Sequence, residues 1–401
     1  MKREVSPVLA VVGILVALTI VQVLYWRGLL GGESRRGGSL SGGGGAGSGS
    51  APPTGSAYVR VSTVAGRTEA GYRDGAGSLA RFDGPAAVAA DSRGMIYVAD
   101  SRNHCVRMVT PDGTVTTLAG IPPRSGYQDG PARRALLSAP AGLAVAHNGG
   151  VFVADTGNHR IRYVANGEVS TYAGAATPKD DLGRQLGGYR DGPAREALFR
   201  YPVGLAVDSA GALYAADAGN RCVRRISPAG MVTTLPTEGG KMQAPTELAL
   251  APNGQVWVAD TAGGRLWVGP SEGPLRPWQP AGEAGGPTRP AGLALAPGLP
   301  KDGAAGLYVA DAESNCLWLA SGGRLTLAAG QQNAGSPGYA DGPGDEARFA
   351  CPSGLAAGAH GEVYVADFDN NCLRRVTATP PPGGAKRSPL ESGAQRRGER
   401  R

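Results

Sequence analysis

A short phrase recurs six times along the chain: a small or apolar residue, then Ala, then Asp. The six copies end at Asp100, Asp155, Asp217, Asp260, Asp311 and Asp367, so successive aspartates are 55, 62, 43, 51 and 56 residues apart. Spacing of this kind is typical of one supersecondary unit repeated in tandem. The sequence therefore predicts six copies of one structural unit.

Each unit is expected to be an antiparallel sheet of four short strands. In residues 202–235 alternating apolar runs are separated by the turn sequences Ser-Ala-Gly, Ala-Gly-Asn and Pro-Ala-Gly, a pattern that predicts strands joined by tight turns. The first strand of the units pairs a leucine with a following alanine, at Leu143, Leu205, Leu248, Leu293 and Leu355. A small residue beside a larger one suits strands crowded around a central channel, so each unit is interpreted as one propeller blade.

The last unit lacks its outer strand, because prolines follow Val376 and cannot continue a hydrogen-bonded ladder. The missing sequence type, Val61-Ser-Thr-Val-Ala-Gly66, stands before the first complete unit. Pairing this segment with the last unit would remove two open sheet edges. The fold class expected is therefore all-β, a six-bladed β-propeller whose ring is closed by an N-terminal strand.

The residues after the repeated aspartate resemble the NHL-repeat family, whose units carry a Val-Ala-Asp-like strand followed by an Asn-His-Arg-Ile-like strand. Residues 158–161 match this second pattern in full, and residues 103–106 and 220–223 match it nearly. The resemblance covers residues 58–376. It implies a propeller but no single function, because the family's functions range from receptor sensing to lyase chemistry.

The ends of the chain predict a membrane tether and two segments without a core. Residues 8–26 carry no charge and are long enough to cross a bilayer, so residues 1–27 are interpreted as an uncleaved signal anchor with the propeller outside the cytoplasm. Residues 28–57 are dominated by Gly and Ser, and residues 377–401 form a basic, proline-containing tail. Both compositions are typical of disorder.

Charge argues against a nucleic-acid partner. Of 40 basic and 33 acidic side chains, five and two precede residue 58 and six and two follow residue 376, so residues 58–376 carry 29 of each sign. A nucleic-acid-binding propeller needs a basic face, which a neutral ring of this kind does not indicate. The ring is expected to be monomeric.

A Gly-Tyr-Xaa-Asp-Gly motif recurs at 71–75, 126–130, 188–192 and 338–342, each time between an outer strand and the next inner strand. One interpretation is a structural loop in which the aspartate, for example Asp191, caps the short turn that follows. The other is a binding rim on the loop-rich face of four blades. The candidate ligand-binding residues under the second interpretation are Tyr72, Arg73, Tyr127, Tyr189, Arg190 and Tyr339.

Neither a metal site nor a disulfide is expected. None of the four histidines is paired with an acidic residue in a metal-binding pattern, and the inner strands offer mainly Ala, Leu and Val where propeller lyases and lactonases place metal ligands. Equivalent cysteines of successive blades are expected beyond disulfide distance, so the five cysteines are predicted to be free thiols. We expect no cofactor and no catalytic residues.

The sequence as a whole favours a protein- or ligand-binding or scaffolding module that is not an enzyme. Its partner would be a protein or glycan held by aromatic and arginine side chains. The alternative is a metal-dependent lyase or lactonase-like propeller with a site in the channel.

Overall fold

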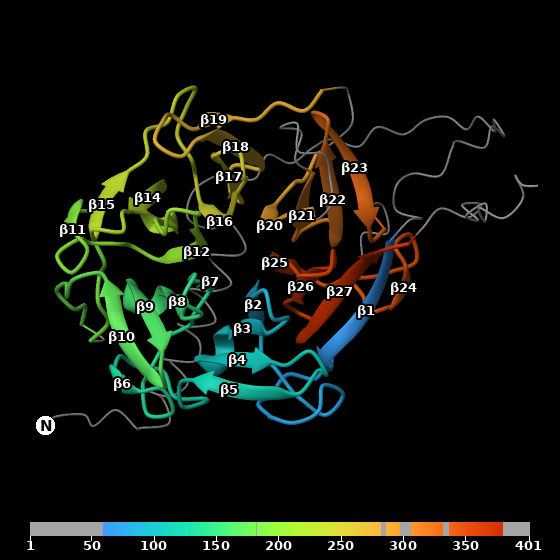
Figure 1. Ribbon diagram of the computed structural model, residues 1–401, viewed down its shortest axis with the longest axis horizontal. Coiled ribbons are helices and arrows are strands. Elements are labelled where there is room, and N and C mark those ends of the chain that lie inside the picture. Colours follow the sequence, from blue (N-terminus) through green and yellow to red (C-terminus); the bar gives the residue numbers. More distant parts are fainter. Residues whose placement is uncertain (1–58, 182, 282–285, 297–305, 332–336, 380–401) are drawn as a thin grey trace, which may run out of the picture. The chain divides into compact units, whose positions relative to one another are not determined.

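The computed structural model describes residues 59–181, 183–281, 286–296, 306–331 and 337–379. These residues form six antiparallel sheets, which follow one another around a ring (Figure 1). Three sheets have four strands, and three carry a short fifth strand at the outer edge. The six-bladed propeller expected from the repeated aspartates is therefore confirmed.

The two inner strands of each blade lie nearest the ring centre (Figure 1). The innermost strands of blades 1 to 6 are β2 (Pro85–Ala90), β7 (Gly142–Val145), β12 (Pro202–Val207), β16 (Pro245–Leu250), β20 (Pro290–Leu295) and β25 (Pro352–Ala357). The second strands, each ending at a repeated aspartate, are β3 (Ile96–Asp100), β8 (Val151–Asp155), β13 (Leu213–Asp217), β17 (Gln255–Asp260), β21 (Leu307–Asp311) and β26 (Val363–Asp367).

The third and fourth strands complete each blade toward the outside. The third strands are β4 (Cys105–Val109), β9 (Arg160–Ala165), β14 (Cys222–Ile226), β18 (Arg265–Pro270), β22 (Cys316–Ser321) and β27 (Cys372–Ala378). The outer strands are β5 (Val115–Ala119), β10 (Glu168–Ala173), β15 (Met231–Thr234), β19 (Arg276–Pro277), β23 (Arg324–Ala329) and, in blade 6, β1 (Val59–Gly66). The short fifth strands are β6 (Gly130–Pro131), β11 (Gly192–Pro193) and β24 (Gly342–Pro343). Each consists of the last glycine of a Gly-Tyr-Xaa-Asp-Gly motif and the proline that follows it.

Neighbouring blades approach closely at glycines of the inner strands. A Cβ added to Gly142 would lie 1.7 Å from the backbone oxygen of Val203 in the next blade, and one added to Gly292 would lie 1.9 Å from that of Ser353. A side chain is therefore excluded at Gly142 and Gly292, whereas blades 1 and 4 carry Ala87 and Glu247 at the equivalent position. The hydrophobic clusters lie between adjacent blades, as where Ala87 and Val106 of blade 1 pack with Leu143 and Val153 of blade 2.

The ring closes as the sequence predicts. Strand β1 pairs with β27 from Val59 opposite Ala378 to Gly66 opposite Cys372, and its other edge pairs with β24. In Figure 1 the blue strand β1 lies beside the red strand β27. The N-terminal strand thus supplies the outer strand that the last repeat lacks.

The predicted signal anchor, residues 1–27, and the linker and most of the tail lie outside the described residues. Among the residues that are described, no helix is long and apolar enough to cross a membrane.

Candidate functional site

The loops that join each outer strand to the next inner strand carry most of the exposed apolar side chains. Seven large apolar residues are exposed in the described part of the chain. Six of them lie in these loops: Tyr72, Leu79, Tyr127, Leu186, Tyr189 and Tyr339, which are 43 to 57% exposed. We call Tyr72, Tyr127, Tyr189 and Tyr339 the tyrosine rim. They belong to blades 1, 2, 3 and 6.

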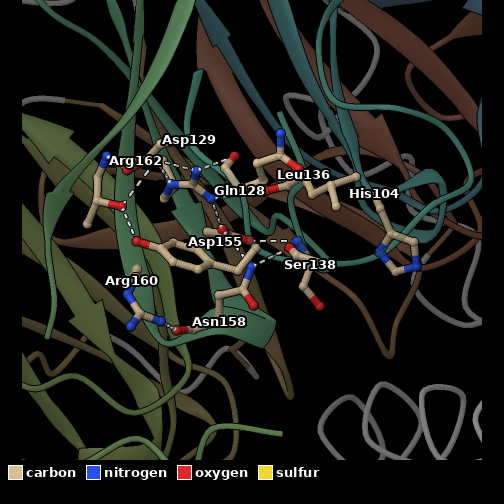
Figure 2. A network of polar contacts seen from close by, with 12 residues as sticks. His104, Gln128, Asp129, Leu136, Ser138, Asp155, Asn158, Arg160 and Arg162 are labelled. Atoms are coloured by element: carbon tan, nitrogen blue, oxygen red, sulfur yellow. Dashed lines mark hydrogen bonds and ion pairs between the residues drawn. The ribbon is translucent and has the colours of Figure 1, made fainter. Parts of the chain in front are cut away.

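Beneath each rim tyrosine lies a buried arginine held by two aspartates, which we call the Arg–Asp clamp. In blade 2, Nη1 of Arg162 lies 2.6 Å from Oδ2 of Asp155 at the end of β8, and Nη2 lies 2.5 Å from Oδ1 of Asp129 in the motif loop (Figure 2). The same guanidinium donates to the backbone oxygens of Leu136 and Gln128. Since Nε also donates to Asp129, all five N–H groups of Arg162 are used.

The clamp recurs with the same partners in three other blades. The sets of arginine, strand aspartate and motif aspartate are Arg107–Asp100–Asp74, Arg224–Asp217–Asp191 and Arg374–Asp367–Asp341. In this order, the arginine nitrogen lies 2.8, 2.8 and 2.7 Å from the strand aspartate. It lies 2.7, 2.6 and 2.8 Å from the motif aspartate. Each arginine side chain is fully buried. The clamp therefore ties the motif loop to the second and third strands of the blade that follows it.

Each rim tyrosine is fixed from two sides. The guanidinium carbon of Arg224 lies 5.0 Å from the centre of the Tyr189 ring and 4.9 Å from that of Phe199, a cation–π sandwich. The hydroxyl of Tyr189 hydrogen-bonds Thr234 at 3.0 Å, and Thr234 in turn donates to Asp191. The other rim tyrosines bond Thr117, Thr171 and Thr63 in the same way. The exposed ring edges are thus held in one orientation.

Burial shapes the electrostatics of the clamp. It raises the pKa of Asp100, Asp217 and Asp367 to about 6, while the charge of the clamp arginine and the hydrogen bonds oppose this rise. In each clamp, an asparagine three residues after the strand aspartate donates a further hydrogen bond to that aspartate. These asparagines are Asn103, Asn158, Asn220 and Asn370. Removing the arginine alone would leave a buried carboxylate with no opposite charge.

Blades 4 and 5, which lack the motif, have tryptophan where the clamp has arginine. In blade 4, Nε1 of Trp267 donates to Oδ2 of Asp260 at 3.2 Å. In blade 5, Nε1 of Trp318 is buried and has no hydrogen-bond partner among the described residues, while Asp311 accepts from the backbone N–H groups of Thr288, Arg289, Glu313 and Ser314. An indole replaces the guanidinium where no motif aspartate is present to share it.

A second bridge joins four of the blades to the next one. His104 and His159 stand in the left-handed backbone region at the start of the third strand, and Nδ1 of each accepts a backbone N–H, from Ala139 and Tyr201 respectively. Asn315 and Asn371 accept from Cys351 and Gly84 at the equivalent places. Burial lowers the pKa of both histidines to about 4, so they act as neutral acceptors.

The structure places the candidate ligand-binding residues on four separate blades. Among the described residues, no two rim tyrosines are in ring contact. Arg73 and Arg190 are both exposed, and Nε of Arg190 donates to the backbone oxygen of Glu196 at 2.8 Å. The sequence suggested that Asp191 caps the turn that follows it, but in the structure its side chain bonds elsewhere. It accepts from the backbone N–H of Thr234 and from Arg224.

Sequence reasoning missed the clamp arginine, although a signal was present. Arginine stands seven residues after the repeated aspartate in the four blades that carry the motif, and nowhere else at this position. Co-occurrence of an arginine with a motif aspartate about 33 residues earlier would have indicated an ion pair.

The six innermost strands contain one ionisable residue, Glu247 of β16, which the sequence analysis did not single out. Glu247 is 8% exposed, and its Oε1 accepts a hydrogen bond from the backbone N–H of Leu248 at 3.1 Å. Burial raises the pKa of Glu247 to about 8, which the bond from Leu248 opposes. Across the described residues, no three His, Cys, Asp or Glu side chains gather as a metal site. The five cysteines are free thiols.

The fold and the repeated clamp define a six-bladed β-propeller built from one repeat type. The family model described as NHL repeat matches residues 82–107, 137–162, 199–226 and 349–375, which are the four blades that carry the clamp. The chain thus contains NHL repeats in these four blades.

Parts of the chain are also similar to curated proteins. The chain is 43% identical over 95 residues to protein SUPPRESSOR OF QUENCHING 1, chloroplastic, of Arabidopsis thaliana, a match covering 23% of this chain and 9% of that protein. It is 37% identical over 92 residues to human NHL repeat-containing protein 2, covering 22% of this chain and 13% of the relative. The matched segments therefore span about a tenth of these relatives' lengths.

Two solved propellers show the same fold. An auxiliary nutrient binding protein from Bacteroides thetaiotaomicron superposes with a TM-score of 0.60 at 16% identity, over 80% of this chain and 77% of that one. A streptogramin B lyase superposes with a TM-score of 0.53 at 13% identity, over 82% of this chain and all of that one. Proteins of this shape include both a binding protein and an enzyme, so the fold does not decide between these functions.

Proposed function

We propose that the chain is a membrane-tethered binding or scaffolding module whose propeller lies outside the cytoplasm and holds a protein or glycan partner on its tyrosine rim. The observation that supports this proposal is the gathering of exposed apolar side chains in one set of loops. Exposed aromatic side chains at fixed positions are typical of binding surfaces.

Preorganisation supports the rim as the binding surface. Each rim ring is held over the clamp arginine and by a threonine hydroxyl, so little side-chain entropy is lost when a partner contacts it. Four similar rings on four blades also offer a partner several equivalent contacts. Blades 4 and 5 have no motif tyrosine, so the rim covers only four of the six blades. A partner on this asymmetric surface would bind in one orientation.

The rim is tested in two steps. Site-specific photocrosslinking from position 73 of the full-length chain first identifies a partner. The affinity of that partner for purified full-length variants is then measured. Tyr72→Ala together with Tyr189→Ala should weaken binding of that partner by about 2 kcal/mol, or roughly 30-fold. Tyr163→Ala is the matched control, because Tyr163 bonds Asn148 in a turn at the opposite end of blade 2. Equal weakening by both variants, or none by the rim variant, contradicts the proposal. Circular dichroism shows which variants remain folded.

The location is tested with protease added to intact cells. The Gly/Ser composition of residues 28–57 is the kind that proteases cut readily, and a closed propeller resists them. Release of a compact fragment that begins near residue 57 supports a propeller outside the cytoplasm. Cleavage only after the membrane is permeabilised would reverse the orientation.

The alternative, a metal-dependent lyase or lactonase-like enzyme, has Glu247 as its one specific support, because a carboxyl group in an inner strand is what channel chemistry would use. Elemental analysis of the purified chain and of Glu247→Gln separates the two functions. A stoichiometric divalent ion that the variant loses would favour the enzyme.

A further inference from the structure

A cleft of about 370 Å³ opens between blades 6 and 1, on the face opposite the tyrosine rim. Its walls include Arg93 and Pro111 of blade 1 and His360, Glu362, Tyr364 and Arg375 of blade 6. Arg93 and His360 belong to turns between first and second strands, and Pro111 to a turn between third and fourth strands. Since the strands are antiparallel, these turns lie at the other end of the blades from the rim loops. The size is that of a small-ligand pocket.

The repeat itself shows what an arginine at this position pairs with. Arg375 stands eight residues after the aspartate of its repeat, and only Arg225 of blade 3 shares that residue and position. Nε of Arg225 donates to the hydroxyl of Tyr214 at 3.1 Å, and its Nη2 lies 3.2 Å from the carboxylate of Glu272 in the next blade. At the junction of blades 3 and 4, the chain thus supplies its own carboxylate.

At the junction of blades 6 and 1, the equivalent carboxylate does not pair with the arginine. Asp112 is the equivalent of Glu272, but it accepts bonds from Thr110 and Thr114 of its own turn. Tyr364, the equivalent of Tyr214, donates to Glu362 at 3.0 Å rather than accepting from Arg375. Within the described residues no carboxylate lies at ion-pair distance from Arg375, which is exposed at the cleft.

The cleft also holds a buried acceptor. Glu362 is 8% exposed, and its two oxygens accept one hydrogen bond each, from Tyr364 and from the backbone N–H of His360. A carboxylate oxygen has two lone pairs, so Glu362 can accept a further donor. Arg93 adds a second guanidinium, which Asp91 fixes at 2.7 Å. The cleft therefore combines a cation for an acid group with an acceptor for a hydroxyl group.

We propose that the cleft between blades 6 and 1 binds a sugar acid, with Arg375 pairing with the carboxylate that takes the place of Glu272 and Glu362 accepting a hydroxyl. The acid could be a free monosaccharide or one residue of an acidic polysaccharide, since the recognised groups are the same. This site lies beyond the proposed function, because it uses neither the rim nor the clamp.

The experiment measures binding of D-glucuronate and of a galacturonate trimer to the full-length chain by saturation-transfer NMR and titration calorimetry. Binding of either acid, with no binding of D-glucose at the same concentration, is expected. Arg375→Gln should weaken that binding roughly tenfold or more, because a charge-assisted pair is lost. The monomer and the trimer distinguish a free acid from a polymer residue as the ligand.

Arg225→Gln is the matched control, because it removes the same residue type at the same repeat position where the chain's own Glu272 is the partner. It should leave glucuronate affinity unchanged. Glu362→Gln tests the hydroxyl contact and should weaken glucuronate more than acetate. Unchanged binding in Arg375→Gln, equal effects of both arginine variants, or displacement of glucuronate by equimolar inorganic phosphate or acetate would each overturn the proposal. Melting temperatures of the variants confirm that they remain folded.

Discussion

At the scale of single residues, the molecule depends on buried charges that are shared rather than isolated. Each clamp arginine uses its whole guanidinium, between a strand aspartate, a motif aspartate and two backbone oxygens, as Arg224 does with Asp217, Asp191, Leu198 and Arg190. A buried ion pair adds little net stability compared with apolar packing, but losing one partner is costly. The clamp therefore fixes the position of the motif loop more than it adds to overall stability.

Arg224→Met should lower the free energy of unfolding by about 3 kcal/mol, because Asp217 is then a buried carboxylate without a counter-charge. The double variant Arg224→Met with Asp217→Leu should lose less than the single one. The adjacent Arg225→Gln is the control and should cost under about 1 kcal/mol, since its pair with the exposed Glu272 is solvated. Urea unfolding measures all three. A double variant as unstable as the single one would contradict the argument.

Glu247 should make stability fall as pH rises. Its pKa is near 8 in the folded chain and 4.5 as the ordinary value, so the unfolded chain releases the proton first. The stabilising contribution is present below pH 4.5 and is lost progressively up to about pH 8, at about 1.4 kcal/mol per pH unit at most. Glu247→Gln should therefore be increasingly more stable than the parent between pH 5 and pH 8. Glu272→Gln, at an exposed position, should show no such trend.

At the scale of elements, the sequence predicted strands well and their side-chain partners poorly. The period of two, the turn residues and the prolines after Val376 indicated the blades and the closing strand, because strand patterning is local. The clamp joins Arg224 to an aspartate 33 residues earlier, and no local pattern reports such a contact. The Asp191 interpretation was wrong for the same reason, since its partner Thr234 belongs to a distant strand.

Connections between blades predict a second pH dependence, of opposite sign. His104 and His159 have a folded pKa near 4 against the ordinary 6.5, so the unfolded chain gains protons first on acidification. Stability should fall between pH 6.5 and pH 4, by about 3 kcal/mol per histidine at most. His104→Asn and His159→Asn should flatten this slope while keeping the bridge, since Asn315 and Asn371 already accept the equivalent N–H groups. Chemical unfolding at several pH values measures the slope, and an unchanged slope in both variants contradicts the account.

At the scale of the whole molecule, the strand that closes the ring also holds part of the tyrosine rim in place. Thr63 of β1 hydrogen-bonds the rim tyrosine Tyr339 and donates to Asp341 of the clamp, as Thr117, Thr171 and Thr234 do in blades 1 to 3. The strand that closes the ring therefore also completes the site of blade 6. Loss of β1 should disturb both the edge of the sheet and the orientation of one rim tyrosine.

Removing residues 59–66 should destabilise the whole propeller, because β27 then presents an unpaired edge and the apolar contacts of Val59 and Val61 with blades 5 and 6 are lost. Val61→Asp tests the same strand without shortening the chain. Val61 is fully buried, so an unpaired carboxylate there should cost about 3 kcal/mol or more. Arg60→Ala, at the exposed neighbouring position, should stay within about 0.5 kcal/mol of the parent. A synthetic peptide of residues 58–66 added to the truncated chain should raise its melting temperature by refilling the edge. A truncated chain that unfolds at the same urea concentration as the parent, with the peptide without effect, would show that closure by β1 does not hold the ring together.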